Sequence, residues 1–181
     1  MTPPIWVLTL AYWLHMLATV IWIGSLATLT ILILPAARKA LDIPAYAKLV
    51  AELQRRLDPV GWFSLALLVG TGLLQMSANP NYHGFLAIEG RWASAIFFKH
   101  LGFLGMVGVS SYLTWGLLPR IQRNTLRQAR RQVVENDSGT QESQQWMKEA
   151  SRLQRQEAML LRINLALGIL ILALTAVARA A

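Results

Sequence analysis

Two histidines lie within long apolar stretches of the sequence. His15 falls in the stretch from Ile5 to Ala37, which contains no Asp, Glu, Lys or Arg, and His100 follows Lys99 in a second apolar stretch. An imidazole that loses water from both ring nitrogens needs a hydrogen-bond partner or a ligand. Two imidazoles on facing helices could ligate one b-type haem axially, with apolar side chains forming the pocket.

Two other interpretations of these histidines stay open. The imidazoles could form part of a copper site with Met16, Met76 or Met106, because imidazole and thioether both suit copper. Alternatively, each histidine is structural and forms a hydrogen bond to a hydroxyl, an amide or a backbone carbonyl of a neighbouring helix. Lys99 could extend to the interface or pair with an anionic group such as a haem propionate, since the apolar stretches contain no carboxylate.

The composition is that of an integral membrane protein with a single domain, residues 1–181. The chain is 55% hydrophobic and only 14% charged, against roughly 25% charged residues in a typical soluble domain, and its mean hydropathy is +0.41. The absence of cysteine excludes disulfides, iron–sulfur clusters and thiolate metal sites. The net charge of +8 does not indicate nucleic-acid binding, because the basic residues follow the membrane topology described next.

Four apolar segments predict an all-α fold, an integral membrane four-helix bundle. A transmembrane helix needs about 20 apolar residues, and the segments that meet or approach this length are 5–37, 60–78, 92–118 and 158–177. Asp58-Pro59 is a plausible N-terminal signal for the second of these helices. The lipid bilayer is therefore the first predicted partner, and other membrane subunits or a second copy of the chain are further candidates.

The distribution of Lys and Arg predicts the orientation. Residues 38–58 hold five and residues 119–162 hold nine, whereas residues 79–91 hold only Arg91 and residues 1–37 hold none. The positive-inside rule then places both basic segments in the cytoplasm and both termini outside, in the inner (plasma) membrane. We expect residues 119–157 to form a cytoplasmic helical hairpin that extends the third and fourth helices, with its turn at residues 136–139.

This topology places the histidines on one side of the membrane. His15 lies ten residues after Ile5 and His100 eight residues after Trp92, which corresponds to about 15 and 12 Å of depth. His83, in the connection between the second and third helices, also falls outside. The residues that share a helical stripe with His15 are expected to face the bundle interior: Tyr12, Thr19, Trp22 and Thr30.

The first, third and fourth apolar segments resemble the copper resistance D family. Segment 13–26 (WLHMLATVIWIGSL) with LPAAR at 34–38 is similar to its opening helix, which has a histidine, a later Trp-x-Gly and a proline–basic ending. Segment 97–100 (FFKH) is similar to its third-helix run ending in lysine, and segment 162–168 (RINLALG) to its Arg-x-Asn-x-x-x-Gly pattern. The resemblance implies a four-helix core linked to copper uptake or handling in the inner membrane.

A similar pattern, with a first-helix histidine and a third-helix lysine, occurs in the bacterial haem-binding protoporphyrinogen oxidase. After Gly24 this chain departs from that enzyme's Gly-Leu-x-Tyr-x-Pro-Arg, while the position of His15 matches in both families. The resulting hypothesis is a membrane protein that binds haem b or copper through His15 and His100 and serves in electron transfer or copper handling. The alternatives are an accessory subunit of a larger membrane complex and an oxidase-like enzyme.

Overall fold

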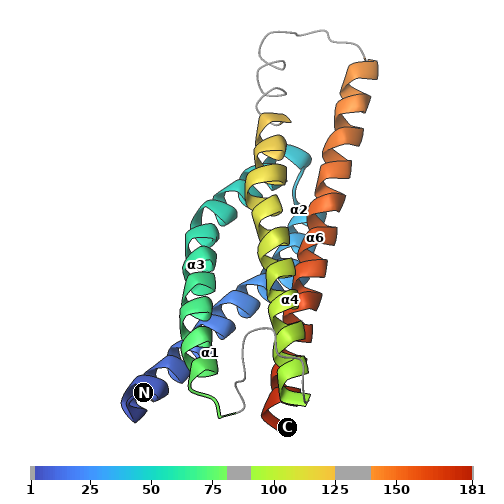
Figure 1. The fold of residues 1–181 in the computed structure, drawn as a ribbon. Coiled ribbons are helices and arrows are strands. Elements are labelled where there is room, and N and C mark those ends of the chain that lie inside the picture. The colour runs from blue at the N-terminus through green and yellow to red at the C-terminus, as the bar shows by residue number, and fades with distance from the viewer. Residues whose placement is uncertain (1–2, 81–90, 125–139, 181) are drawn as a thin grey trace.

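The computed structural model describes residues 3–80, 91–124 and 140–180. Within these ranges the chain forms helices joined by short turns, and no strand occurs. Four helical stretches are long and apolar enough to cross a membrane (Figure 1), namely Ile5–Ala40, Ile43–Ser77, Trp92–Asn124 and Gln145–Ala180. The chain is therefore a multi-pass membrane protein with an all-α, four-helix architecture, as the apolar segments predicted.

Two of the membrane helices contain a π-helical segment just before a proline. The first stretch consists of α1 (Ile5–Ala27), the π-helical η1 (Thr28–Ile33) and α2 (Leu34–Ala40). The third begins with α4 (Arg91–Ser111) and continues through the π-helical η2 (Tyr112–Leu117). Each π-helical segment ends two residues before a proline, Pro35 or Pro119. Because proline lacks an N–H and its ring clashes with the carbonyl four residues earlier, a wider turn lets the helix continue past it.

The second membrane helix, α3 (Ile43–Ser77), starts earlier than the sequence suggested. The side chain of Asp42 accepts a hydrogen bond from the backbone N–H of Ala45 (3.0 Å) and caps the helix, which then runs through Pro59. The prediction that Asp58-Pro59 begins this helix is wrong, because Asp42 supplies a cap sixteen residues upstream of Asp58. The Asp58 side chain instead lies within the helical bundle, near Thr114 of η2.

The fourth membrane helix extends far beyond a bilayer. Helix α6 (Thr140–Ala180) has 41 residues, about 62 Å at 1.5 Å per residue, against a hydrocarbon core of about 30 Å. Together with the continuation of the third stretch to Asn124, it forms the two arms of the predicted hairpin. The predicted turn at 136–139 and His83 lie outside the described residues.

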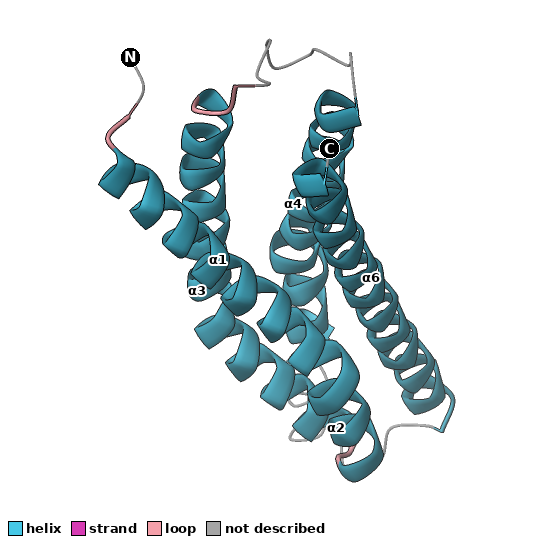
Figure 2. Cartoon of the chain, turned by 90° about the horizontal axis from the view of Figure 1, so that it is seen from below, coloured by secondary structure: helices cyan, strands magenta, loops and turns pink. Residues whose placement is uncertain are grey.

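The four stretches pack as two helix pairs. Helix α1 packs along α3, and α4 packs along α6; the two pairs separate toward the end that holds both termini (Figures 1 and 2). The pairs meet where Gly168 of α6 lies against Ile23 of α1 and Met106 of α4. The buried core continues from there along the bundle, and its members include Trp22, Leu26, Leu65, Leu113 and Leu161.

The outward faces are apolar, as a lipid-facing surface requires. Large apolar side chains that are each at least 60% exposed include Trp6, Trp13, Val20, Phe63, Leu104 and Trp115. A surface this apolar is not typical of a soluble monomer. On α1 the buried stripe consists of Ala11, Ala18, Trp22 and Leu26. Tyr12, which was expected on this stripe, is exposed, because α1 is rotated so that Trp22 and His15 pack against Gly61 and Gly72 of α3.

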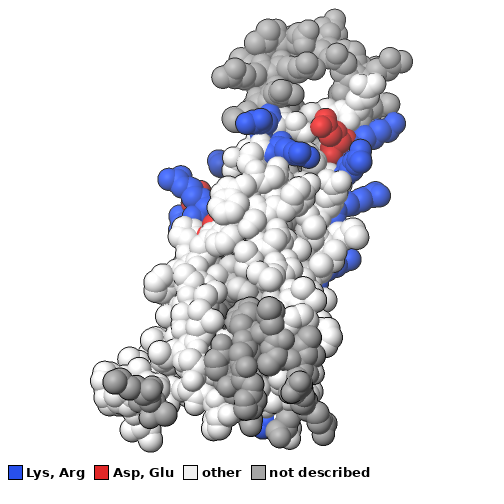
Figure 3. Space-filling model, viewed as in Figure 1, with Lys and Arg blue, Asp and Glu red and all other residues white. Residues whose placement is uncertain are grey.

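The two ends of the bundle differ in charge. Lys and Arg side chains gather at the end opposite the termini (Figure 3), and we call this the basic end; its exposed members include Arg55, Arg56, Arg120, Arg152 and Arg155. The opposite end, which holds residues Ile5 and Ala180, is called the terminal end. This separation follows the distribution of Lys and Arg on which the predicted orientation rests.

Candidate functional site at the terminal end

His15 is held against α3 by a polar contact inside the membrane segment. Its Nδ1 lies 2.8 Å from Oγ1 of Thr71, and that hydroxyl donates its single proton to the carbonyl of Leu67 (2.6 Å). Thr71 can therefore only accept from His15, so Nδ1 carries the imidazole proton. In the neutral ring the lone pair is then on Nε2, which has no hydrogen-bond partner among the described residues.

This arrangement is typical of a metal-ligating histidine. Such a histidine almost always donates its other ring N–H to a carboxylate, a carbonyl or a water, and that hydrogen bond fixes both the tautomer and the orientation of the ring. Here the hydroxyl of Thr71 is the acceptor of this hydrogen bond. The imidazole ring also lies against Gly72, the residue after Thr71, since a Cβ placed on Gly72 would lie 3.4 Å from Cε1 of His15. Thr71 was not among the residues predicted from the sequence.

Further contacts hold α1 against α3 around His15. Gln75, one turn after Thr71, donates from Nε2 to the carbonyl of Ala11 (3.1 Å). Thr19 donates to the carbonyl of His15 itself (2.7 Å), so this hydroxyl is satisfied within its own helix. The Nδ1 edge of His15 therefore lies on α3, beside a second hydrogen bond that joins the two helices.

His100 adopts the same tautomer on the other helix pair. Its Nδ1 lies 2.7 Å from the carbonyl of Ile96, one turn earlier on α4. Because a carbonyl only accepts, Nδ1 of His100 is the donor. The hydrogen bond of His15 thus runs to α3, whereas this hydrogen bond stays within α4. Joint ligation of one cofactor by His15 and His100 stays a prediction.

Two cationic side chains reach the neighbourhood of His15 from the other pair. Lys99 on α4 and Arg179 on α6 lie close enough for their charges to act on the His15 imidazole, and Arg179 acts in the same way on Lys99. Every described acidic residue comes before the apolar run of its own helix, in the part of that helix that lies at the basic end. These residues are Asp42, Glu52, Asp58, Glu142, Glu149 and Glu157. Among the described residues, the terminal end is therefore a region of positive charge without a carboxylate.

Two of the three thioethers considered for copper, those of Met16 and Met106, lie apart from the His15 contacts. Met16 is 60% exposed on the outer side of α1. Met106 is buried beside Gly168 and Ile23, where the helix pairs cross. Over residues 3–80, 91–124 and 140–180, no three His, Cys, Asp or Glu side chains lie together as a metal-ion cluster.

A second polar cluster lies at the basic end and was not predicted. Glu157 of α6 is only 1% exposed and accepts a hydrogen bond from the hydroxyl of Tyr46 on α3 (3.0 Å). Arg38 of α2 donates from Nε to the same hydroxyl (3.3 Å) and from Nη2 to the carbonyl of Gln154, and its Nη2 lies 4.0 Å from the Glu157 carboxylate. This cluster links three helical elements and satisfies a buried charge.

A third polar contact joins α6 to α4 in the middle of the bundle. Asn164, also 1% exposed, donates from Nδ2 to Oγ of Ser110 (2.9 Å). Its Oδ1 is buried without a partner among the described atoms, as is Nε1 of Trp22.

Comparison of the chain with family models, with curated proteins and with solved structures gives no match.

Proposed function

We propose that this membrane protein binds haem b, whose iron Nε2 of His15 would hold, and that it serves in electron transfer. The observation that carries the proposal is the His15–Thr71–Leu67 chain of hydrogen bonds, which holds the proton on Nδ1 and so leaves the lone pair of the neutral ring on Nε2. Haem b needs one or two such nitrogens in apolar surroundings, and it supplies one-electron redox chemistry when bound.

The charge distribution at the terminal end supports the same ligand. A haem carries two propionates, and anionic groups inside a membrane protein require cationic partners. Lys99 and Arg179 act electrostatically on the His15 region, and among the described residues no carboxylate competes for them there. We assign the propionates to Lys99 and Arg179. His100, which follows Lys99 on α4, is the second residue that we propose would hold the haem iron.

Haem is favoured over copper by the positions of the candidate ligands. Met16 lies exposed on α1 and Met106 lies buried at the crossing of the helix pairs, so neither supplies a thioether to His15 in the described contacts. The resemblance to the copper resistance D family and to the haem-binding oxidase is compatible with a first-helix histidine ligand in both cases. We further propose that the membrane is the bacterial inner membrane, with the basic end in the cytoplasm.

The test is the visible spectrum of the protein purified in detergent. We expect a Soret band in the wild type that is lost in His15→Ala, because only this substitution removes the nitrogen that Thr71 orients. Thr19→Val is the matched control, since Thr19 lies one turn away and its hydroxyl bonds only to the backbone of α1. Helix content measured by circular dichroism checks that each variant is folded.

Each alternative gives a different result. A colourless protein that contains stoichiometric copper by elemental analysis would replace haem with copper. A protein with neither cofactor would favour the accessory-subunit role, and the haem proposal would be rejected. A Soret band that persists in both His15→Ala and His100→Ala would reject these ligands specifically. Consumption of protoporphyrinogen by the purified protein would favour the oxidase-like enzyme.

A further inference from the structure

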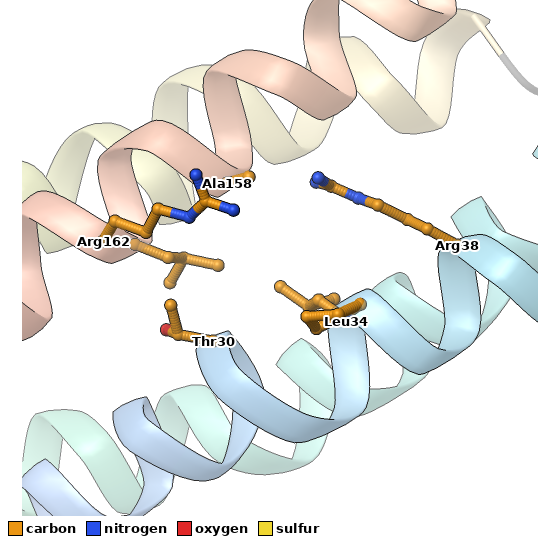
Figure 4. A pocket seen from close by; sticks show the side chains of 7 residues that line it. Thr30, Leu34, Arg38, Ala158 and Arg162 are labelled. Atoms are coloured by element: carbon orange, nitrogen blue, oxygen red, sulfur yellow. The ribbon is translucent and has the colours of Figure 1, made fainter.

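A small pocket lies between the first and fourth membrane helices toward the basic end. Figure 4 shows it between the η1–α2 segment, which contributes Thr30, Leu34 and Arg38, and α6, which contributes Ala158 and Arg162. The two guanidinium groups extend into the same space from opposite sides. The pocket is remote from the His15 contacts and plays no part in the proposed haem site.

Arg162 is the unusual residue of this pocket. It lies four residues into the apolar run 158–177, is exposed, and has no hydrogen-bond or ion-pair partner among the described residues. A charged side chain within a membrane segment is costly unless it is paired or reaches the interface. An arginine also presents a planar set of N–H donors that matches the oxygens of a phosphate. Arg162 therefore has unused capacity to bind an anion.

The local charge balance points the same way. Arg38 is engaged through Nε and Nη2 with Tyr46, Gln154 and the Glu157 carboxylate, which leaves its Nη1 without a partner in the described part of the chain. Glu157 supplies a single negative charge, which cannot balance both Arg38 and Arg162. Oγ1 of Thr30, which also lines the pocket, is buried without a hydrogen-bond partner there.

The surroundings of the pocket distinguish a lipid from a soluble anion. Met159, one turn before Arg162, is 64% exposed, and Ile31, one turn before Pro35, is 61% exposed. Helical spacing places each of these exposed side chains within one turn of a residue that lines the pocket, so both helices offer apolar surface on either side of it, which we call the apolar rim. A free phosphate gains nothing from such a rim, whereas a phospholipid has acyl chains to lay against it. The pocket itself has room for about one water-sized atom, which suits a single phosphate oxygen with the rest of the headgroup outside.

We infer that Arg162 and Arg38 form a binding site for the phosphate of an anionic phospholipid from the leaflet at the basic end. The guanidinium groups bind the phosphate oxygens, Thr30 offers a hydroxyl, and the acyl chains pack on the rim that contains Ile31 and Met159. Basic pockets between membrane helices on the cytoplasmic side are known to take anionic lipid headgroups. The lipid would bridge the first and fourth membrane helices.

Native mass spectrometry of the full chain tests this site. The protein is mixed with equal amounts of phosphatidylglycerol and phosphatidylcholine of the same acyl chains, and the bound lipids are counted. We expect the wild type to retain phosphatidylglycerol preferentially and Arg162→Gln to lower this retention about tenfold or more, because the substitution removes a direct hydrogen-bonded contact between a guanidinium and a charged phosphate. Arg55→Gln is the matched control, because Arg55 is exposed at the same end and does not line the pocket. Its lipid retention should equal that of the wild type.

Three outcomes would overturn the inference. Equal losses in Arg162→Gln and Arg55→Gln would mean that only the overall surface charge attracts the lipid. A wild type without preference for phosphatidylglycerol would reject the site outright. Displacement of the lipid by excess inorganic phosphate, with phosphate bound in its place, would identify a soluble-anion site.

A second variant, Thr30→Val, should weaken the retention of phosphatidylglycerol less than Arg162→Gln does. Unchanged helix content shows that both variants fold.

Discussion

The two ends of the bundle hold buried polar groups of different kinds. At the basic end, the carboxylate of Glu157 is hydrogen-bonded to Tyr46 and lies near Arg38, so the buried negative charge is balanced within the protein. At the terminal end, His15 bonds only to a neutral hydroxyl, while Lys99 and Arg179 add positive charge. The basic-end cluster is complete as it stands, whereas the terminal end has an imidazole nitrogen and two cations left to bind something.

This contrast separates structural polar groups from candidate ligands within one membrane protein. Both regions satisfy part of their hydrogen-bonding capacity, and burial alone does not distinguish them. The distinguishing feature is whether a partner of opposite charge is present. The comparison predicts that substitutions at the basic end change stability, and that substitutions around His15 change cofactor binding.

The largest effect is expected from Glu157→Ala. Removal of this carboxylate leaves the Tyr46 hydroxyl and the Arg38 guanidinium without their buried partner, which should lower the free energy of unfolding by about 3–5 kcal/mol. Chemical unfolding in detergent, followed by circular dichroism, measures it. Glu149→Ala is the control, because Glu149 is exposed on the same helix. The structural role of the cluster would be refuted by equal stability of the two variants, or by a loss of cofactor absorbance per folded molecule in Glu157→Ala.

Thr71→Val should have the next largest effect. It should weaken the binding of haem and leave the stability of the protein almost unchanged. Valine keeps the volume of threonine but removes the acceptor for Nδ1 of His15, so the ring is no longer held in one tautomer. Loss of such a supporting hydrogen bond typically weakens ligand binding about 10–100-fold, and titration of the apoprotein with haemin measures the change. Thr175→Val removes a hydroxyl that bonds only within α6, and it should bind haemin like the wild type. Equal affinities for Thr71→Val and the wild type would show that Thr71 does not orient a ligand.

Gln75→Leu tests whether the contacts around His15 affect cofactor binding only by holding α1 against α3. The substitution removes the hydrogen bond to the Ala11 carbonyl, which should cost about 1 kcal/mol of stability. The Soret maximum should stay unchanged because the Thr71 contact is intact. A spectral change as large as that of Thr71→Val would mean that both contacts act only by holding α1 against α3.

Gly72→Ala should have the smallest effect. The added Cβ would meet Cε1 of His15 at 3.4 Å, an ordinary van der Waals contact. We therefore expect a change in stability of less than about 0.5 kcal/mol and at most a small shift of the Soret maximum, both measured on the same sample. Loss of the band in this variant would show that the ring has no freedom to adjust and that the site is tighter than the contacts indicate.

Much of the fold could be predicted from the sequence, and little of the polar pairing could. The four apolar segments predicted the four membrane helices because hydropathy is a local property. The start of α3 was missed because Asp58-Pro59 resembles a helix start, while the cap at Asp42 stands next to a less apolar segment. The contact of His15 with Thr71 joins residues 56 apart, and that of Tyr46 with Glu157 joins residues 111 apart. Neither spacing has a signature in a single sequence.

The sequence by itself determined that the chain spans a membrane as helices, and that basic residues gather at one end. Both follow from the residues alone, since backbone groups in lipid must bond within a helix and charges remain at its ends. Only the tertiary structure decided which face of each helix is buried and which helices pair. It is the rotation of α1 against α3 that gives His15 the hydroxyl of Thr71, because the packing of Trp22 and His15 against Gly61 and Gly72 of α3, and not hydropathy, sets that rotation.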